Sequence, residues 1–194
     1  MKKIKFFICC LILSFCFFAE AGTFTKIDLP KQDLQKANLE DATFFSYTGE
    51  IVNEDEDKFK QIIDKYKKNI YVVIDSNGGL FLTGIKLGSL TAIHNVHIIV
   101  DKAYSASGFW AYGDKSRIFL DEKESELGLH LPYNEIDENP GDSMVLGATL
   151  YLYLHDICEL DNALSFISEL GDVRKQYGTH GMIVFTKKEK KIVH

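Results

Sequence analysis

The chain has 194 residues and a formal net charge of −6, with 46% hydrophobic and 26% charged residues. This length suits one domain with a substantial buried core, and the composition excludes a largely disordered chain. The acidic balance and the lack of a basic stripe argue against a nucleic-acid partner.

Residues 1–21 have the three parts of a secretory signal peptide. Three lysines among the first five residues precede an apolar run over residues 6–18, and Ala19-Glu20-Ala21 supplies the small residues of a cleavage site. We expect cleavage before Gly22, export to the periplasm or beyond, and no membrane association afterwards. An uncleaved membrane anchor is the alternative. Cleavage would leave Cys158 as the last cysteine, so no internal disulfide is expected.

The mature chain is expected to start with a surface segment, residues 22–42, followed by one domain over residues 43–194. Residues 43–52 are rich in aromatic and β-branched side chains, which is typical of a strand. Residues 53–68 carry apolar side chains at helical spacing. Acidic residues at the start of this segment and lysines at its end complement a helix dipole, so we predict a helix.

A strand–helix–strand unit follows. Residues 70–74 and 96–100 are continuous apolar runs, which predict central strands buried on both faces. Residues 81–93 predict the helix between them. Because such a crossover joins parallel strands, the expected class is α/β, with a mostly parallel sheet flanked by helices.

The later elements are expected to be shorter, apart from two helices near the C-terminus. The first of these helices is apolar enough to be part of the core or an oligomer face. In chain order the pattern predicts a helix over residues 105–112, strands over 118–120 and 127–131, a solvated loop over 134–141, helices over 143–159 and 162–177, a strand over 182–185 and a charged tail.

Three motifs with chemical potential lie at predicted strand ends. A serine nucleophile needs a base and N–H donors for the oxyanion, and the carboxyl ends of parallel strands meet at one sheet edge. Ser107 in Ser-Ala-Ser-Gly is the predicted nucleophile, and His130 in Gly-Leu-His-Leu-Pro is the predicted base. The N–H groups of Gly79 and Gly108 are the predicted oxyanion donors. Ser105 is a competing hydroxyl two residues before Ser107.

The ordered motifs Ser-Asn-Gly-Gly, Ala-Tyr-Ser-Ala-Ser-Gly and Leu-Gly-Leu-His-Leu-Pro resemble the Clp protease proteolytic subunit, of the ClpP/crotonase fold. The resemblance is greatest to exported, stand-alone ClpP-like proteins and covers about residues 44–133. It implies repeated ββα units and a serine peptidase with Ser107 and His130 as nucleophile and base. It also implies an extended peptide substrate and homo-oligomerisation.

The sequence departs from this family at the third member of the catalytic triad. Met182 stands about where the family has an aspartate, and Asp172 is the nearest acidic residue upstream, although it matches no motif. Loss of the orienting carboxylate typically costs on the order of 10⁴ in rate. The alternative is therefore a catalytically inactive ClpP-like protein that binds peptides or supports assembly, and a secreted interaction protein is a third reading. No metal or other cofactor is expected, because His155 and Glu159 offer only two ligands at helical spacing.

Overall fold

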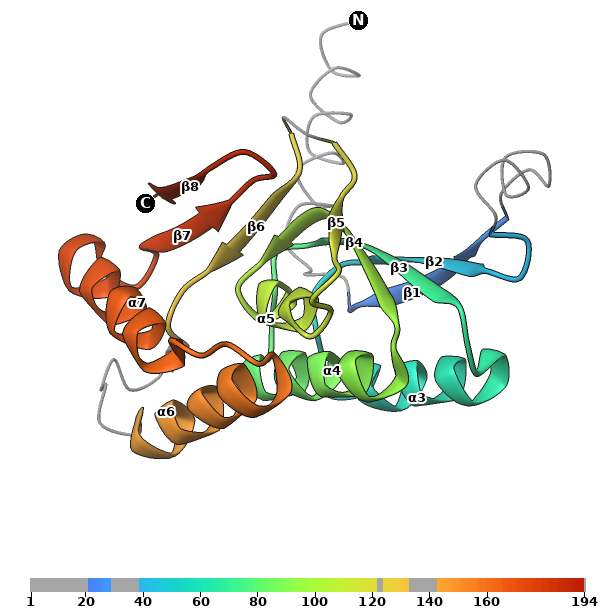
Figure 1. The fold of residues 1–194 in the computed structure, drawn as a ribbon, viewed down its shortest axis with the longest axis horizontal. Coiled ribbons are helices and arrows are strands. Elements are labelled where there is room, and N and C mark those ends of the chain that lie inside the picture. The colour runs from blue at the N-terminus through green and yellow to red at the C-terminus, as the bar shows by residue number, and fades with distance from the viewer. Residues whose placement is uncertain (1–20, 29–38, 122–123, 133–142, 194) are drawn as a thin grey trace, which may run out of the picture.

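A computed structural model describes residues 21–28, 39–121, 124–132 and 143–193, and its centre is one eight-stranded sheet (Figure 1). The strands are β1 (Thr23–Ile27), β2 (Thr43–Thr48), β3 (Ile70–Ser76), β4 (His97–Tyr104), β5 (Ile118–Phe119), β6 (Glu126–Leu129), β7 (Met182–Phe185) and β8 (Lys190–Val193). The helices are α3 (Asp55–Tyr66), α4 (Phe81–His94), α5 (Ala106–Tyr112), α6 (Ser143–Leu152), its π-helical continuation η2 (Tyr153–Ile157), and α7 (Ala163–Tyr177).

The strand order in the sheet is β1-β2-β3-β4-β6-β7-β8, and β5 pairs with β4. The pairs β2–β3, β3–β4, β4–β5 and β4–β6 are parallel, whereas β1, β7 and β8 join in antiparallel fashion. The predicted α/β class, with a mixed and mostly parallel sheet flanked by helices, is therefore confirmed. The helix predicted over residues 53–68 and the strand–helix–strand unit that follows it are confirmed as α3, β3, α4 and β4.

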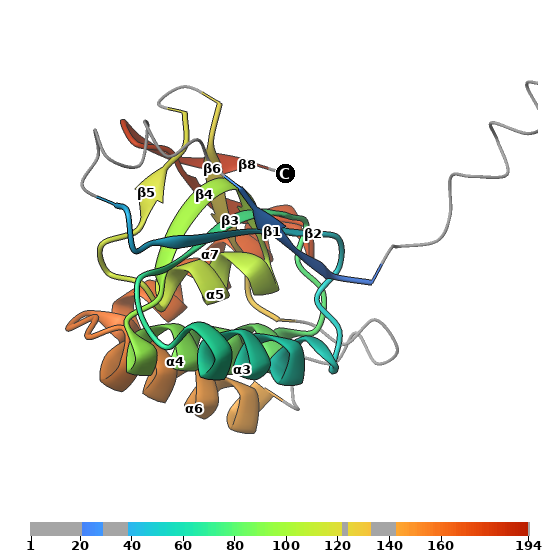
Figure 2. The same cartoon turned by 90° about the vertical axis from the view of Figure 1, so that its right-hand side faces the viewer.

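Helices α3, α4 and α6 form a layer along one face of the sheet, and α5 lies between α4 and the strands (Figures 1 and 2). The core is centred on the fully buried Trp110 of α5, whose indole N–H donates to the Thr91 hydroxyl at 2.9 Å. The rings of Tyr47 and Phe59 pack edge-on against it, with centroids 4.9 and 5.4 Å away. These contacts of Trp110 anchor helix α5 in the core, and they thereby fix the position of the residues at the start of the helix.

Two edge strands differ from the sequence-based expectation. The segment over residues 22–42 was expected on the surface, but part of it forms β1, and Phe24 packs 4.8 Å from Tyr47 between ring centroids. The charged tail forms β8, which pairs with β7 through residues such as Ile192. Both strands are short and bury few side chains, so they lack the apolar runs that identify central strands.

The predicted signal peptide and the loop predicted over residues 134–141 lie outside the described residues, apart from Ala21. None of the helices that the structure describes is long and apolar enough to cross a membrane.

Candidate functional site at one sheet edge

The carboxyl ends of the adjacent strands β3, β4 and β6 bring the predicted motifs to one edge of the sheet. Ser105 follows β4 directly, and its backbone N–H donates to the Gly128 carbonyl of β6 at 2.8 Å. His130 lies two residues beyond Gly128, just past the end of β6. The glycine turn Gly78-Gly79 follows β3. Ser105, His130 and this turn are therefore neighbours along a single sheet edge.

Ser105 has a strained backbone, with φ 56° and ψ −123°, at the junction between β4 and α5. A non-glycine residue with positive φ is uncommon, and such strain costs on the order of 1–3 kcal/mol. A serine on a sharp strand-to-helix turn is also how hydrolases present a nucleophile above a sheet. Ser105 is only half-buried, in contrast to the residues of α5 that follow it directly.

Ser107, the predicted nucleophile, occupies a different environment. Its side chain is fully buried, and its Oγ lies 2.8 Å from the carbonyl oxygens of Ser76 and of Tyr104. The hydroxyl hydrogen is therefore donated to the ends of β3 and β4, which it ties to the first turn of α5. Ser107, the predicted nucleophile, therefore has a structural hydrogen-bonding role, whereas Ser105, the competing hydroxyl, belongs to a residue that is partly exposed.

The turn after β3 requires glycine at both positions. Gly78 and Gly79 have φ values of 111° and 133°, which side chains rarely adopt. A Cβ atom at Gly78 would lie 2.7 Å from the Cβ of Ser105, and one at Gly79 would lie 2.4 Å from the Ile51 carbonyl oxygen. The absence of a Cβ atom at Gly78 lets the turn approach Ser105 closely, and its absence at Gly79 lets the turn pack against the backbone of Ile51.

Gly108, the second predicted oxyanion donor, serves packing between α5 and β6. A Cβ atom there would lie 2.4 Å from the Gly128 carbonyl oxygen, so only glycine permits this approach. The N–H of Ala106, the residue after Ser105, is the first of α5 and has no intrahelical acceptor. With Ser105 as nucleophile, Ala106 is therefore the better placed donor on this helix.

His130 is half-buried, and its Nδ1 lies 2.8 Å from the Leu131 carbonyl oxygen. Because a carbonyl oxygen accepts only, this contact requires hydrogen on Nδ1 and leaves Nε2 of the neutral ring unprotonated. Burial lowers the pKa of His130, the Leu131 carbonyl raises it, and the nearby His180 and Arg174 lower it further. His130 is thus favoured in its neutral form, which is the form that a general base needs.

No carboxylate is among the described groups that shift the pKa of His130. Asp172, offered as the orienting acid, has a side chain that is 70% exposed and pairs with Lys175 at 3.3 Å. The β6–β7 register pairs Leu129 with Ile183, so Met182 stands at the next position, opposite His130. An apolar residue therefore lies on the neighbouring strand where a carboxylate would be useful.

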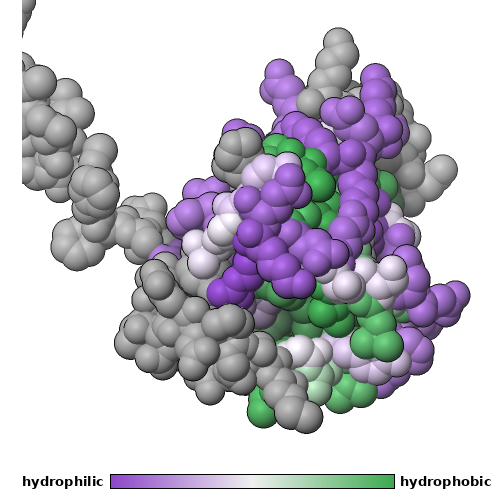
Figure 3. All heavy atoms as spheres, turned by 90° about the vertical axis from the view of Figure 1, so that its left-hand side faces the viewer, coloured by the Kyte–Doolittle hydropathy of each residue, from purple (hydrophilic) through white to green (hydrophobic). Residues whose placement is uncertain are grey.

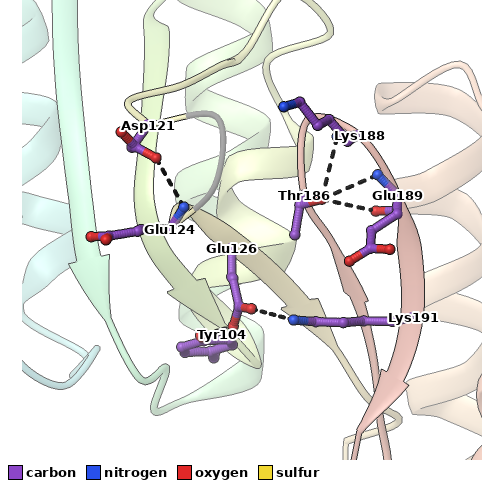
Figure 4. A network of polar contacts seen from close by, with 8 residues as sticks. All are labelled: Tyr104, Asp121, Glu124, Glu126, Thr186, Lys188, Glu189 and Lys191. Carbon is purple, nitrogen blue, oxygen red and sulfur yellow. Dashed lines mark hydrogen bonds and ion pairs between the residues drawn. The ribbon is translucent and has the colours of Figure 1, made fainter.

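The acidic residue of β6 is already engaged elsewhere. Figure 4 shows Glu126 between Tyr104 and Lys191, which hydrogen-bond its carboxylate at 2.5 and 2.6 Å. The hydrogen bonds from Lys191 and Tyr104 lower the pKa of Glu126, so it remains ionised and bound to them. This network joins β4, β6 and β8 across the sheet at the amino end of β6.

Two pockets flank the serine–histidine edge. One pocket, of about 620 Å³, lies between α6 and α7. Its wall is mostly apolar and includes Leu131, the residue after His130, together with Pro132, Leu150 and Ile167; Arg174 also lines it. Figure 3 shows the molecule from this side, with hydrophobic surface bordered by hydrophilic side chains. The other, of about 280 Å³, is formed by residues 49–50 and 75–79 at the ends of β2 and β3.

Metal binding and a cysteine nucleophile are less well supported than a serine nucleophile in the described part of the chain. No group of three or more histidine, cysteine, aspartate or glutamate residues there could hold a metal ion. Cys158 is buried, and burial raises the pKa of its thiol to about 11, so it is a poor nucleophile. Comparison with known proteins identifies no matching family model and no matching curated protein.

Proposed function

We infer that the chain is an exported serine hydrolase of the ClpP-like type, with the ClpP/crotonase fold and peptidase activity. The observation that carries this inference is the strained backbone of Ser105 at the β4–α5 junction. Strain of this kind persists where the surrounding structure enforces it, and it concentrates at active sites. The half-buried His130 on the adjacent strand end and the glycine turn beside Ser105 supply the other parts that acyl transfer needs.

In this mechanism the Ser105 hydroxyl attacks the carbonyl carbon of a peptide, and Nε2 of His130 takes the hydroxyl proton. The negative oxygen of the tetrahedral intermediate is held by the N–H of Ala106 and by the N–H of Gly79, because the Gly78 N–H already donates to the Ser76 hydroxyl at 3.1 Å. His130 then donates its proton to the departing amine, which leaves an ester on Ser105. Water, activated by the same histidine, hydrolyses that ester and regenerates the serine.

In a complete triad a carboxylate both orients the histidine and stabilises its charged form, and the Leu131 carbonyl provides the first of these two effects. It fixes the Nδ1–H tautomer of His130 through the 2.8 Å contact. A neutral carbonyl stabilises the imidazolium less than a carboxylate does, because it carries no net charge. We therefore expect slow turnover, with the apolar pocket beside Leu131 accepting an apolar group of an extended peptide.

A catalytically inactive ClpP-like protein that binds peptides is the second candidate. The exposed position of Asp172 and the apolar Met182 opposite His130 favour it, because neither provides an orienting acid. The two candidates differ in one measurable property, the reactivity of Ser105.

The test is treatment of the folded protein with a fluorophosphonate, followed by tandem mass spectrometry to locate the adduct. We expect one adduct on Ser105, because only an activated serine reacts with such a reagent. No adduct on the folded protein would contradict the hydrolase and leave the peptide-binding candidate. An adduct on Ser107 alone would contradict the assignment of the nucleophile.

The rate of this labelling should depend on the protonation of His130. Its pKa is lowered, first by burial, so the neutral base persists at pH values below the ordinary histidine value of 6.5. We expect the labelling rate to fall with acidification at a midpoint below pH 6.5, as measured over a pH series on the folded protein. A midpoint at or above pH 6.5 would contradict the lowered pKa of His130, and a labelling rate that does not fall on acidification would contradict its role as base.

A further inference from the structure

The smaller pocket is distinguished by the chemistry of its walls. Its lining comes from the turn at Gly49 and Glu50 and from residues 75–79, which begin with Asp75. Glu50 and Asp75 both line this pocket, and both residues are exposed to solvent. Among the residues that the structure describes, no lysine, arginine or histidine lines it. The volume of about 280 Å³ lies at the lower end for ligand pockets, which suits one side chain of a longer ligand.

Neither carboxylate is neutralised by a partner within the described chain. All the ion pairs of the described residues involve other acidic side chains, among them Glu126 with Lys191. Lys102 on β4 is the register partner of Asp75, but Lys102 and Asp75 form no ion pair in the described structure. The charge of Lys102 contributes instead to the lowered pKa of Glu126. The pocket therefore keeps two negative charges that the fold does not use.

The pocket is adjacent to the proposed nucleophile. Gly78 is part of its lining, and a Cβ atom at Gly78 would lie 2.7 Å from the Cβ of Ser105. Glu50 approaches from the other side, since a Cβ atom at Gly79 would lie 2.8 Å from the Glu50 Cγ. A side chain that enters this pocket would consequently belong to a peptide whose backbone passes Ser105.

We propose that this pocket binds a lysine or arginine side chain of the peptide, with Glu50 and Asp75 as specificity-determining residues. The inference rests on the proposed function, because it places the peptide at Ser105. A flexible aliphatic stem fits between the glycine turns, while its cationic end lies between the two carboxylates. The apolar pocket beside Leu131 lies on the histidine side of the edge, so the substrate would carry a cationic group and an apolar group on opposite sides of the nucleophile.

The test uses nuclear magnetic resonance, which detects binding without catalysis. The backbone amide signals of Gly49, Gly78 and Gly79 are followed while acetyl-Ala-Ala-Lys-Ala-Ala-amide or its norleucine counterpart is added to the wild-type chain. Norleucine has a similar stem without the charge. We expect the lysine peptide to bind about fivefold to tenfold more tightly, and this advantage to shrink as salt is raised to about 0.3 M.

The double variant Glu50→Gln/Asp75→Asn should lose the advantage, whereas Asp64→Asn, at an exposed position of α3, should keep it. Equal binding of the two peptides, an advantage that survives in the double variant, or no binding of either peptide would overturn the proposal. Fluorophosphonate labelling of Ser105 does not depend on this pocket's charge. A labelled Ser105 with equal peptide binding would therefore refute the specificity and leave the hydrolase intact.

Discussion

Ser105→Ala should lower both fluorophosphonate labelling and hydrolysis of a sensitive peptide ester by on the order of 10³-fold or more, because it removes the attacking oxygen. The fold should remain, since Ser105 is half-buried and its side chain makes no capping hydrogen bond to α5 in the described structure. Alanine also tolerates the small space beside Gly78 at least as well as serine does. Labelling rates and circular dichroism of the two proteins measure both expectations.

Ser107→Ala is the matched control, because it removes a hydroxyl only two residues away. It should cost about 1–3 kcal/mol of unfolding free energy, since the carbonyls of Ser76 and Tyr104 lose a buried donor at 2.8 Å. Labelling should persist to within a few-fold at temperatures where the variant is folded. Loss of labelling in folded Ser107→Ala together with normal labelling of Ser105→Ala would reverse the assignment.

The central elements of the fold could be predicted because their patterns are strong. The apolar runs in β3 and β4 and the charged ends of α3 have few alternative explanations. The edge strands β1 and β8 escaped prediction because each contributes little buried surface. Pairing with a neighbouring strand, which determines both, is not visible in a local pattern.

The shared sheet edge of the three motifs could be predicted, but the different environments of Ser105 and Ser107 could not. Strand-end motifs are expected to meet at one sheet edge, because the topology of a parallel sheet brings such ends together, and the ends of β3, β4 and β6 do meet there. The choice between Ser105 and Ser107 depends on the backbone angles of one residue and on which hydroxyl faces the core. A Ser-Ala-Ser motif contains neither kind of information. The end of β4 at Tyr104 is the one local signal, since it puts Ser105 at the turn itself.

A buried polar cluster around Asp55 was likewise not predicted, because a carboxylate in the first helical turn is normally a solvated dipole partner. Here Asp55 is fully buried and accepts hydrogen bonds from the Tyr47 hydroxyl at 2.8 Å and the Val52 N–H at 2.9 Å. Lys58 bonds its second oxygen at 2.8 Å and also the Gly22 carbonyl at 3.0 Å. One carboxylate thus joins β2, α3 and the start of β1.

Asp55→Ala should lower the free energy of unfolding by about 2–4 kcal/mol, because it leaves the buried Tyr47 hydroxyl and the Val52 N–H without their acceptor. Burial, followed by the hydrogen bond to Asp55, raises the pKa of Tyr47, so this hydroxyl stays protonated and requires an acceptor. Asp57→Ala is the matched control: Asp57 is exposed in the same helical turn, and its loss should cost under about 1 kcal/mol.

Urea unfolding followed by circular dichroism measures the wild type and each variant under one condition. Asp55→Asn should fall between wild type and Asp55→Ala, since the amide oxygen can still accept from Tyr47 while the attraction to Lys58 is lost. The substitution should also affect the candidate site, because two backbone hydrogen bonds connect Gly22 to the Gly78 turn. The Gly22 N–H donates to the Glu50 carbonyl at 2.7 Å, and the N–H of the next residue, Ile51, donates to the Gly78 carbonyl at 2.7 Å. A cost for Asp55→Ala no larger than that for Asp57→Ala would mean that this cluster does not hold β1 and the Gly78 turn together.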